Sequence, residues 1–286
     1  MRPRCESSCK KQMAKAGSFV RKSDGFKVQR WRCVQCRRYY STARKSPCYR
    51  QKKRHLNPLI EKFLCSTMSQ RRIAKLLGIS RLTLTRKFLF LGKGAISKNA
   101  KDLEAFEGGK IKEVLVDEME DIVHTKCKPV SIALIVTHDR RILGHAVSRI
   151  RPKTRKLNEK SKKKYPQWTP NAEEKFGELL KKLKPILHDE VIIHSDKKWF
   201  YERQIREILP NARHVRYKSR RAKDSGQGEL KEGHSDPLFP LNHTCGMLRA
   251  NINRLIRKTW CTSKKLEALD MHIAIYTHFH NNVLLK

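Results

Sequence analysis

The sequence has few acidic residues and no long apolar run. Asp and Glu number 27 against 65 Lys and Arg, which leaves a formal net charge of +38 over 286 residues. A folded body this basic repels itself, so an anionic partner is expected, and nucleic acid is the first candidate. No apolar segment approaches the roughly 20 residues that a membrane-spanning helix needs. The basic start of the chain leads into no secretory signal. We therefore expect a cytoplasmic protein with no membrane partner.

The sequence also lacks the evenly spread cysteines of a secreted disulfide framework. Five of its nine cysteines fall within the first 50 residues: Cys5, Cys9, Cys33, Cys36 and Cys48. Such uneven usage indicates reduced thiols and a metal site rather than a set of disulfides.

Residues 1–50 are predicted to form a small zinc-ribbon module. Cys5-x3-Cys9 and Cys33-x2-Cys36 are two cysteine pairs separated by a basic, strand-prone stretch with a turn at Ser23-Asp24-Gly25. Four thiolates suit tetrahedral Zn²⁺. A module this small buries little core, so a bound metal would supply the missing stability. The alternatives are a ribbon that has lost its metal, unrelated thiols, or Cys48 as a substitute ligand.

Residues 55–93 are predicted to form a helix-turn-helix. Apolar residues recur at helical spacing, Ser69 and Ser80 each precede a helical run as N-caps, and Gly78 permits the turn between the two helices. The second helix of this motif enters the DNA major groove. Its outward-facing polar residues are the predicted DNA contacts: Arg81, Thr83, Thr85 and Arg86. The alternative is an ordinary helical hairpin with a solvated basic face.

Two segments are expected to lack a core of their own. Residues 94–111 are mixed in composition and are predicted to link the DNA-reading modules to the next domain. A basic insertion around residues 151–168 contains a low-order stretch from Arg151 to Lys164. It is interpreted as a solvated loop that also offers a phosphate-binding patch.

Residues 112–286 are predicted to form an RNase H-like α/β domain. A short apolar strand ends at Asp117, and two β-branched strands follow with a hairpin signal between them. A helix, a second apolar strand ending at Asp196, another helix and a strand come next, and residues 241 to about 280 are predicted to be helical. The first and fourth strands of this fold lie side by side, so Asp117 and Asp196 should meet.

Two carboxylates and a third oxygen ligand can hold two Mg²⁺ or Mn²⁺ ions about 4 Å apart. By strand alternation, Glu118 should point to the face opposite Asp117, which makes it secondary. His194 shares a side with Asp196 and is expected to pack beside the site rather than to bind metal.

The chain resembles insertion-sequence transposases of the IS1 and IS1595 type. Three stretches carry the resemblance: Val116-Asp117-Glu118-Met119, His194-Ser195-Asp196, and Leu241 to Arg249 continuing through residues 254–260. In the IS1 family the catalytic Glu stands seven residues before the Arg of a Leu-Arg pair. Counting seven back from Arg249 gives Asn242. The pattern therefore resembles the D-D-N variant found among IS1595-like members.

The resemblance implies a prokaryotic, nucleoid-associated transposase that cleaves DNA at terminal inverted repeats and joins the ends to target DNA. Pairing two DNA ends implies a homodimer or a larger synaptic complex. Asn242 would be a Mg²⁺ ligand, and Arg249, two helical turns away on the same face, would grip the scissile phosphate. Asn242 could instead be a helix N-cap, and His243 or Asp236 could be the third ligand.

Two other functions stay open from the sequence. One is a DNA-binding regulator whose RNase H-like domain no longer reacts. The other is an RNase H-like nuclease that acts on structured nucleic acid.

Overall fold

The fold is mixed α/β. A computed structural model describes residues 2–7, 9–22, 25–218, 236–256 and 262–285. The chain divides into two compact units, residues 1–59 and residues 60–286. Within the described residues, no helix combines the length and the apolar character needed to cross a membrane.

The first unit contains a three-stranded antiparallel sheet in the order β1-β2-β3. Its strands are β1 Met13–Val20, β2 Lys27–Cys33 and β3 Tyr39–Ser41. Short 3-10 helices follow at Thr42–Lys45 and Arg54–Leu56. The start of β1 pairs with the end of β2, with Met13 opposite Cys33. Ser23 and Asp24 of the expected turn lie outside the described residues.

The second unit is built on a five-stranded mixed sheet in the order β6-β5-β4-β7-β8. Its strands are β4 Ile111–Ile122, β5 Pro129–Val136, β6 Ile142–Arg149, β7 Leu187–Asp196 and β8 Arg213–Tyr217. β4, β5 and β6 form an antiparallel meander. β7 runs parallel to β4, and β8 runs parallel to β7. The expected pairing of the first and fourth strands of this domain is confirmed. The first strand does not end at Asp117 as expected, because β4 continues to Ile122 through its pairing with β5.

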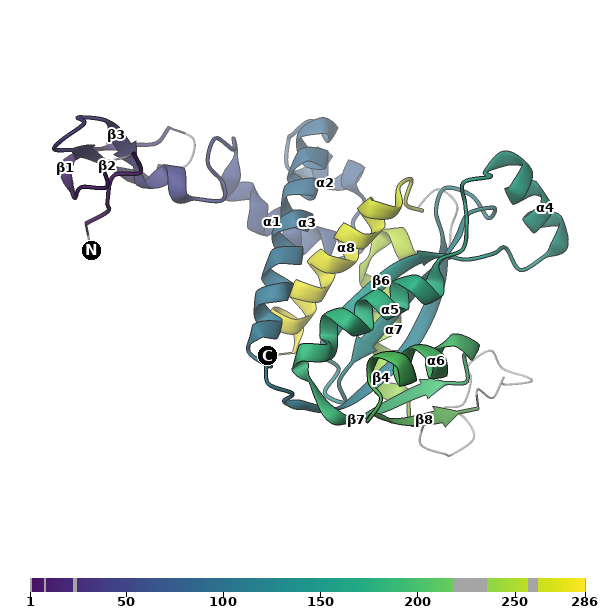
Figure 1. The fold of residues 1–286 in the computed structure, drawn as a ribbon. Coiled ribbons are helices and arrows are strands. Elements are labelled where there is room, and N and C mark those ends of the chain that lie inside the picture. Colours follow the sequence, from purple (N-terminus) through teal and green to yellow (C-terminus); the bar gives the residue numbers. More distant parts are fainter. Residues whose placement is uncertain (1, 8, 23–24, 219–235, 257–261, 286) are drawn as a thin grey trace. The chain divides into compact units, whose positions relative to one another are not determined.

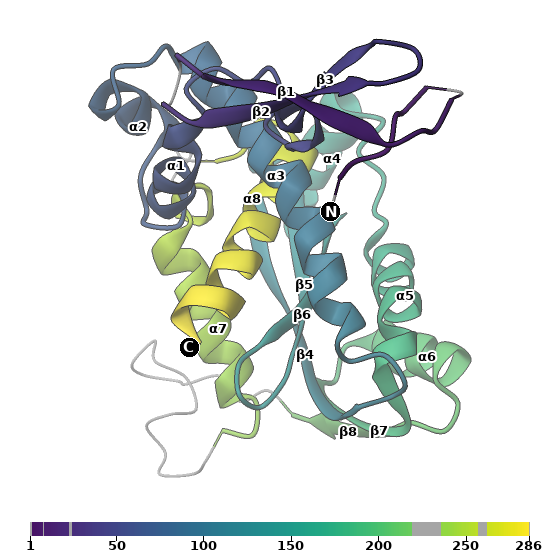
Figure 2. The same cartoon turned by 90° about the vertical axis from the view of Figure 1, so that its left-hand side faces the viewer.

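Helices cover both faces of this sheet, with α5 and α6 on one face and α7 and α8 on the other (Figures 1 and 2). The α-helices of the chain are α1 Asn57–Leu64, α2 Gln70–Leu76, α3 Arg81–Glu104, α4 Arg155–Lys164, α5 Ala172–Leu183, α6 Trp199–Ile208, α7 Phe239–Asn251 and α8 Leu266–Phe279. Shorter helical turns are the 3-10 helices Lys184–Ile186 and Asn253–Leu255 and the π-helix His280–Leu284.

The largest buried apolar cluster lies between the sheet and helices α5 and α6. Val114 and Val116 of β4 belong to it, together with Phe176 of α5 and Phe200 of α6. Successive side chains of a strand point to opposite faces. Asp117, next to Val116, is therefore turned to the face that α7 and α8 cover.

The linker expected at residues 94–111 is helical for most of its length, because α3 continues to Glu104. α3 packs along α8 within the second unit (Figure 2). Asn99 donates a hydrogen bond to the Ala274 carbonyl at 3.0 Å, and Ala95 is buried. Gly92 and Gly94 disfavour helix, but packing against α8 keeps α3 helical through both of them.

The basic stretch expected to be a low-order loop contains helix α4. The Thr154 side chain caps the helix by accepting from the Leu157 N–H at 3.4 Å. Lys162, Lys163 and Lys164 occupy the last turn, where cations favour the negative end of the helix dipole. The buried Ser161 hydroxyl donates to the Cys127 carbonyl at 2.7 Å and ties the helix to the domain.

The helical segment expected from residue 241 to about 280 is not continuous. α7 ends at Asn251, and Ile252 is extended. Thr67, from the turn after α1, donates its backbone N–H to the Asn251 carbonyl at 2.8 Å. This bond satisfies a carbonyl that the helix itself leaves open at its C-terminus. Residues 257–261, which include the end of the last stretch quoted for the resemblance, lie outside the described residues.

Gly92 is expected to be essential to the contact between α3 and α8. A Cβ at Gly92 would lie 2.7 Å from Met271 Cβ, whereas a Cβ at Gly94, in the same helix, meets nothing within 4 Å. Gly92→Ala should destabilise the protein by about 1–3 kcal/mol. Gly94→Ala should stabilise it by roughly 0.5–1 kcal/mol, because alanine favours the helix. Urea denaturation followed by circular dichroism checks both, and equal effects of the two variants would contradict the close contact.

Candidate functional site

Four cysteines of the first unit form a group that could bind zinc. Cys5 lies 3.6 Å from Cys36 and Cys9 lies 3.6 Å from Cys33, sulfur to sulfur. All four sulfurs lie within 4.8 Å of one another. Sulfurs bound about 2.3 Å from a tetrahedral Zn²⁺ are about 3.8 Å apart, whereas a disulfide joins them at about 2.0 Å. The spacing fits a metal site and not a pair of disulfides.

Cys48 is not a member of this group. Its sulfur instead lies 3.6 Å from the Asn57 side-chain nitrogen. The four predicted cysteines are therefore the ones that the fold brings together, and the substitution of Cys48 for one of them is not supported.

In the second unit, the strand register sets Asp117 beside Asp196. Val116 of β4 pairs with Ser195 of the parallel strand β7, and the two aspartates are the next residues on these strands. Asp117 Oδ1 accepts from the Glu118 N–H at 2.6 Å, and Asp196 Oδ1 accepts from the Lys198 N–H at 3.2 Å. The two carboxylates thus share one place on the sheet although they are distant in sequence.

Burial, and next to it the neighbouring Asp196 charge, raise the pKa of Asp117 to about 7. Lys198 and Arg249 oppose this shift with their positive charges. Burial also raises the pKa of Asp196, against the hydrogen bond from the Lys198 backbone. The protein thus holds two carboxylates where water stabilises their charges poorly, an arrangement that a bound cation would relieve.

Helix α7 lies over this part of the sheet and carries the remaining predicted residues. Asn242, Cys245 and Arg249 follow one another at spacings of three and four, so they share a face of the helix. Burial, and to a smaller extent the negative charge of Asp117, raise the pKa of the Cys245 thiol to about 12. The face that bears Asn242 and Arg249 is therefore the face turned toward Asp117.

Asn242 is not the N-cap of α7. The helix begins at Phe239, so Asn242 lies inside it, and its side-chain nitrogen donates to Asp236 Oδ2 at 2.7 Å. Asp236 itself holds the start of the helix, because its Oδ1 accepts from the Leu238 N–H at 2.9 Å. The negative charge of Asp236 also raises the pKa of Asp117. His243 points elsewhere, with Nδ1 3.3 Å from the Arg140 guanidinium.

Lys198 and Tyr201 also act on the aspartate pair, and no motif in the sequence indicated either residue. The Lys198 ammonium contacts Glu118 Oε2, and its charge also reaches Asp117. The Tyr201 hydroxyl is buried without a hydrogen-bond partner among the described residues, and the charges of Asp117 and Asp196 raise its pKa in addition to burial. Both residues lie a few positions after Asp196, at the start of α6.

Glu118 is turned away from Asp117, as strand alternation predicts. It pairs with Ala133, which belongs to the buried cluster beneath α5 and α6, whereas Asp117 pairs with Leu134. The Glu118 side chain is only 3% exposed and accepts from the Ser131 hydroxyl at 2.5 Å. It fixes the Lys198 side chain rather than joining the pair of aspartates.

His194 lies two residues before Asp196 on β7 and therefore on the same face of the sheet. Its Nδ1 lies 2.8 Å from the Tyr217 hydroxyl, and its Nε2 lies 2.6 Å from Glu113 Oε1. Glu113 and His138 complete a second group with potential ligand atoms within 4.8 Å of one another. Sequence reasoning missed this group because its members come from three separate strands and turns.

The two helices of the predicted helix-turn-helix are α2 and α3, and α3 carries the predicted DNA contacts. The Ser69 and Ser80 side chains accept from the N–H groups of Arg72 and Thr83, so both expected N-caps are present. Of the four predicted contact residues, Arg81 and Arg86 are exposed and Thr83 and Thr85 are half-buried. Thr85 donates its hydroxyl to the Arg81 carbonyl at 3.0 Å within the helix.

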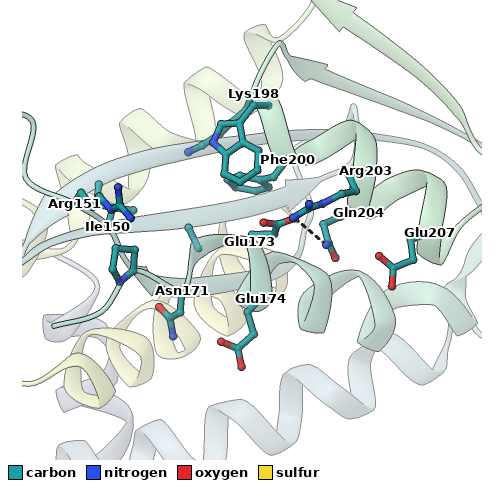
Figure 3. A pocket seen from close by; sticks show the side chains of 13 residues that line it. Ile150, Arg151, Asn171, Glu173, Glu174, Lys198, Phe200, Arg203, Gln204 and Glu207 are labelled. Carbon is teal, nitrogen blue, oxygen red and sulfur yellow. Dashed lines mark hydrogen bonds and ion pairs between the residues drawn. The ribbon is translucent and has the colours of Figure 1, made fainter. Parts of the chain in front are cut away.

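A groove of about 880 Å³ opens next to Lys198, between the starts of α5 and α6 (Figure 3). Trp199 lines it and is 73% exposed. Figure 3 shows Arg203 reaching across to Glu173, with which it forms an ion pair. The walls of the groove thus mix basic, acidic and aromatic side chains, and they include Lys198, whose charge acts on Asp117.

No protein-family model matches the chain, and a search of curated proteins finds no match. The functional assignment therefore depends on the residues and their geometry.

Removal of zinc is expected to unfold the first unit. Cys33→Ser should abolish zinc binding at the four-cysteine group and the cooperative unfolding of residues 1–59, because a bound metal would stabilise so small a unit. Cys48→Ser, in the same unit but outside the four-cysteine group, should keep the zinc ion of that group. Metal analysis of the purified proteins checks this, and a Cys33→Ser variant with the same zinc content as Cys48→Ser would contradict it.

The stability of the metal-free second unit should depend on Asp117. The folded state raises the pKa of Asp117 from 3.8 to about 7, so it favours the protonated acid. Stability is therefore lost as pH rises from about 4 to about 7. At pH 8, without Mg²⁺ or Mn²⁺, Asp117→Asn should stabilise the protein by about 2–4 kcal/mol. At pH 4 the variant should match wild type.

Asp189→Asn is the control for this prediction, because Asp189 is an exposed carboxylate on the same sheet. It should leave denaturation midpoints unchanged at both pH values. A stabilisation by Asp117→Asn that is the same at pH 4 and pH 8 would show that ionisation of Asp117 is not its cause.

Proposed function

We propose that this chain is a DNA transposase of the IS1 and IS1595 type. The single observation that carries the proposal is the pairing of Asp117 and Asp196 at neighbouring positions of parallel strands, beneath the face of α7 that bears Asn242 and Arg249. Two acids and a cation held in this way suit phosphodiester cleavage and strand transfer, where catalysis consists of positioning and charge stabilisation.

An RNase H-like fold for the second unit is part of the proposal. In chain order the strands of the sheet lie 3-2-1-4-5, with the first three antiparallel and the last two parallel to the first. Helices separate the later strands and cover both faces (Figure 1). This is the element order that the sequence predicts for such a domain.

The donor set at the aspartate pair fits Mg²⁺ or Mn²⁺. Asp117 and Asp196 offer hard carboxylate oxygens, which these ions prefer. The nearby Tyr201 hydroxyl, which has no hydrogen-bond partner within the described part of the chain, would bind a water molecule of the metal shell. When bound, two such ions would activate the attacking water or hydroxyl and stabilise the leaving oxygen.

The third ligand is proposed to be the side-chain oxygen of Asn242. Its nitrogen donates to Asp236, so the oxygen is the end of the amide left for a metal. Asp236 is the alternative third ligand, because its carboxylate is near enough for its charge to raise the pKa of Asp117. Asn242 contributes no charge, which should weaken the binding of one ion.

The residues around the pair have separate tasks in this proposal. Arg249 would hold a non-bridging oxygen of the scissile phosphate. Lys198, fixed by Glu118, would neutralise part of the charge that develops there. The exposed Arg81 and Arg86 of α3 would bind the terminal inverted repeats, and the zinc-binding unit would add a further DNA contact. Joining two ends requires a homodimer or larger synaptic complex.

A second candidate is a DNA-binding regulator. The observation that favours it is the neutral Asn242 at the place where related catalytic sites carry a third acid. A regulator would bind the element ends in the presence of a chelator and would not cleave them in Mg²⁺ or Mn²⁺.

Purified protein with Mn²⁺ and duplex DNA carrying the ends of its own element should give nicked and strand-transfer products. Asp117→Ala and Asp196→Ala should each reduce the product rate by at least about 1000-fold, since each removes a metal ligand. Both variants should still bind the element ends in a mobility-shift assay. Gel analysis of labelled DNA measures cleavage.

Glu190→Ala is the matched control, because Glu190 is an exposed acid on β7, the strand that ends at Asp196. It should cleave like wild type. Full activity of either aspartate variant would overturn the site. Specific binding without any metal-dependent product by the wild type would favour the regulator, and preferential cleavage of branched or hybrid substrates would favour a nuclease.

A further inference from the structure

Three side chains on the α7 face of the sheet meet beside the aspartate pair without belonging to it. Glu113 comes from β4, His194 from β7, and His138 from the turn after β5. Glu113 is two strand positions before Leu115, which pairs with His194, so both side chains point to one face. The group therefore results from strand register and not from proximity in sequence.

The ligand atoms of the group lie close enough together for one metal ion to bind all three after small shifts. Glu113 Oε1 lies 2.6 Å from His194 Nε2 and 3.2 Å from His138 Nε2. All three ligand atoms lie within 4.8 Å of one another. Ligand atoms about 2.1 Å from a tetrahedral Zn²⁺ are about 3.4 Å apart, so shifts of a few tenths of an ångström to about one ångström would complete the geometry.

A partner on the far side of His194 favours metal binding through Nε2. The Tyr217 hydroxyl lies 2.8 Å from His194 Nδ1, and the two rings are stacked with centroids 5.7 Å apart. When Nδ1 carries the proton and donates it to Tyr217, the Nε2 lone pair is directed at Glu113 and His138. Histidine ligands in metal sites are typically oriented by such a second hydrogen bond.

We propose that Glu113, His138 and His194 bind one divalent transition-metal ion of the zinc class, at a site separate from the cysteine group and from the aspartate pair. Two imidazoles and one carboxylate prefer Zn²⁺, Co²⁺ or Ni²⁺ to Mg²⁺. Glu113 and His138 are 43% and 48% exposed, so water can reach the ion and fill the remaining position. The protein would then separate its metals by ligand chemistry.

The position of this site links it to the aspartate pair. His194 is two residues before Asp196, and Glu113 is four residues before Asp117, on the same two strands. The turn that carries His138 also carries Arg140, which contacts His243 of α7. A bound ion would join β4, β7 and this turn, and so would hold the strands and the helix that carry the aspartates, Asn242 and Arg249.

The test is a zinc titration of the full-length protein in excess Mg²⁺, with a chelating dye as competitor. Wild type should bind one tight equivalent at the cysteines and a second, weaker equivalent. His138→Asn and Glu113→Gln should each weaken the second equivalent at least about 10-fold and leave the first unchanged. Tyr217→Phe should weaken it by about 10-fold, because it removes only the orienting hydrogen bond.

His188→Asn, at the other end of β7, is the matched histidine control and should bind two equivalents like wild type. X-ray absorption at the zinc edge of a Cys33→Ser protein with one equivalent should show nitrogen and oxygen neighbours. A wild type that binds one equivalent only would overturn the proposal. So would a second equivalent that survives His138→Asn and Glu113→Gln but disappears in Asp196→Asn, since that ion would belong to the aspartate pair.

Discussion

The parallel pairing of β4 with β7 is the constraint on which the rest of the second unit depends. One register, with Val116 opposite Ser195, sets Asp117 beside Asp196 and Glu113 near His194. A slip of one residue would turn one strand's side chains to the other face and separate both groups. The buried cluster beneath α5 and α6 holds this register, because Val114, Val116, Val191 and Ile193 must all face it.

The cost of this arrangement is electrostatic. Two carboxylates are held together in a partly buried place, and burial and mutual repulsion raise the pKa of Asp117 to about 7. The surrounding cations offset only part of this, since Lys198 is shared with Glu118. Sites that bind cations commonly store strain of this kind, and the ion relieves it when it binds. The high net positive charge of the chain is consistent with such a site, because it favours the approach of a polyanion.

Residues outside the aspartate pair connect the two faces of the sheet. Lys198 contacts Glu118 on the face of α5 and α6, yet its charge reaches Asp117 on the other face. Cys245 and Tyr201 bring α7 and α6 near the same carboxylate. Helix packing on either face can thus influence the site, and Lys198 itself also lines the groove between α5 and α6 (Figure 3).

The sequence by itself determined which four cysteines come together, the N-caps at Ser69 and Ser80, and the two neighbouring strands that carry Asp117 and Asp196. Each of these depends on local spacing or on strand alternation, which the order of residues records directly. The tertiary structure alone decided that α3 runs on through the expected linker, that Thr67 meets the end of α7, and that Glu113, His138 and His194 meet. These contacts join segments far apart in the chain. Their formation depends on packing and register, which no local pattern encodes.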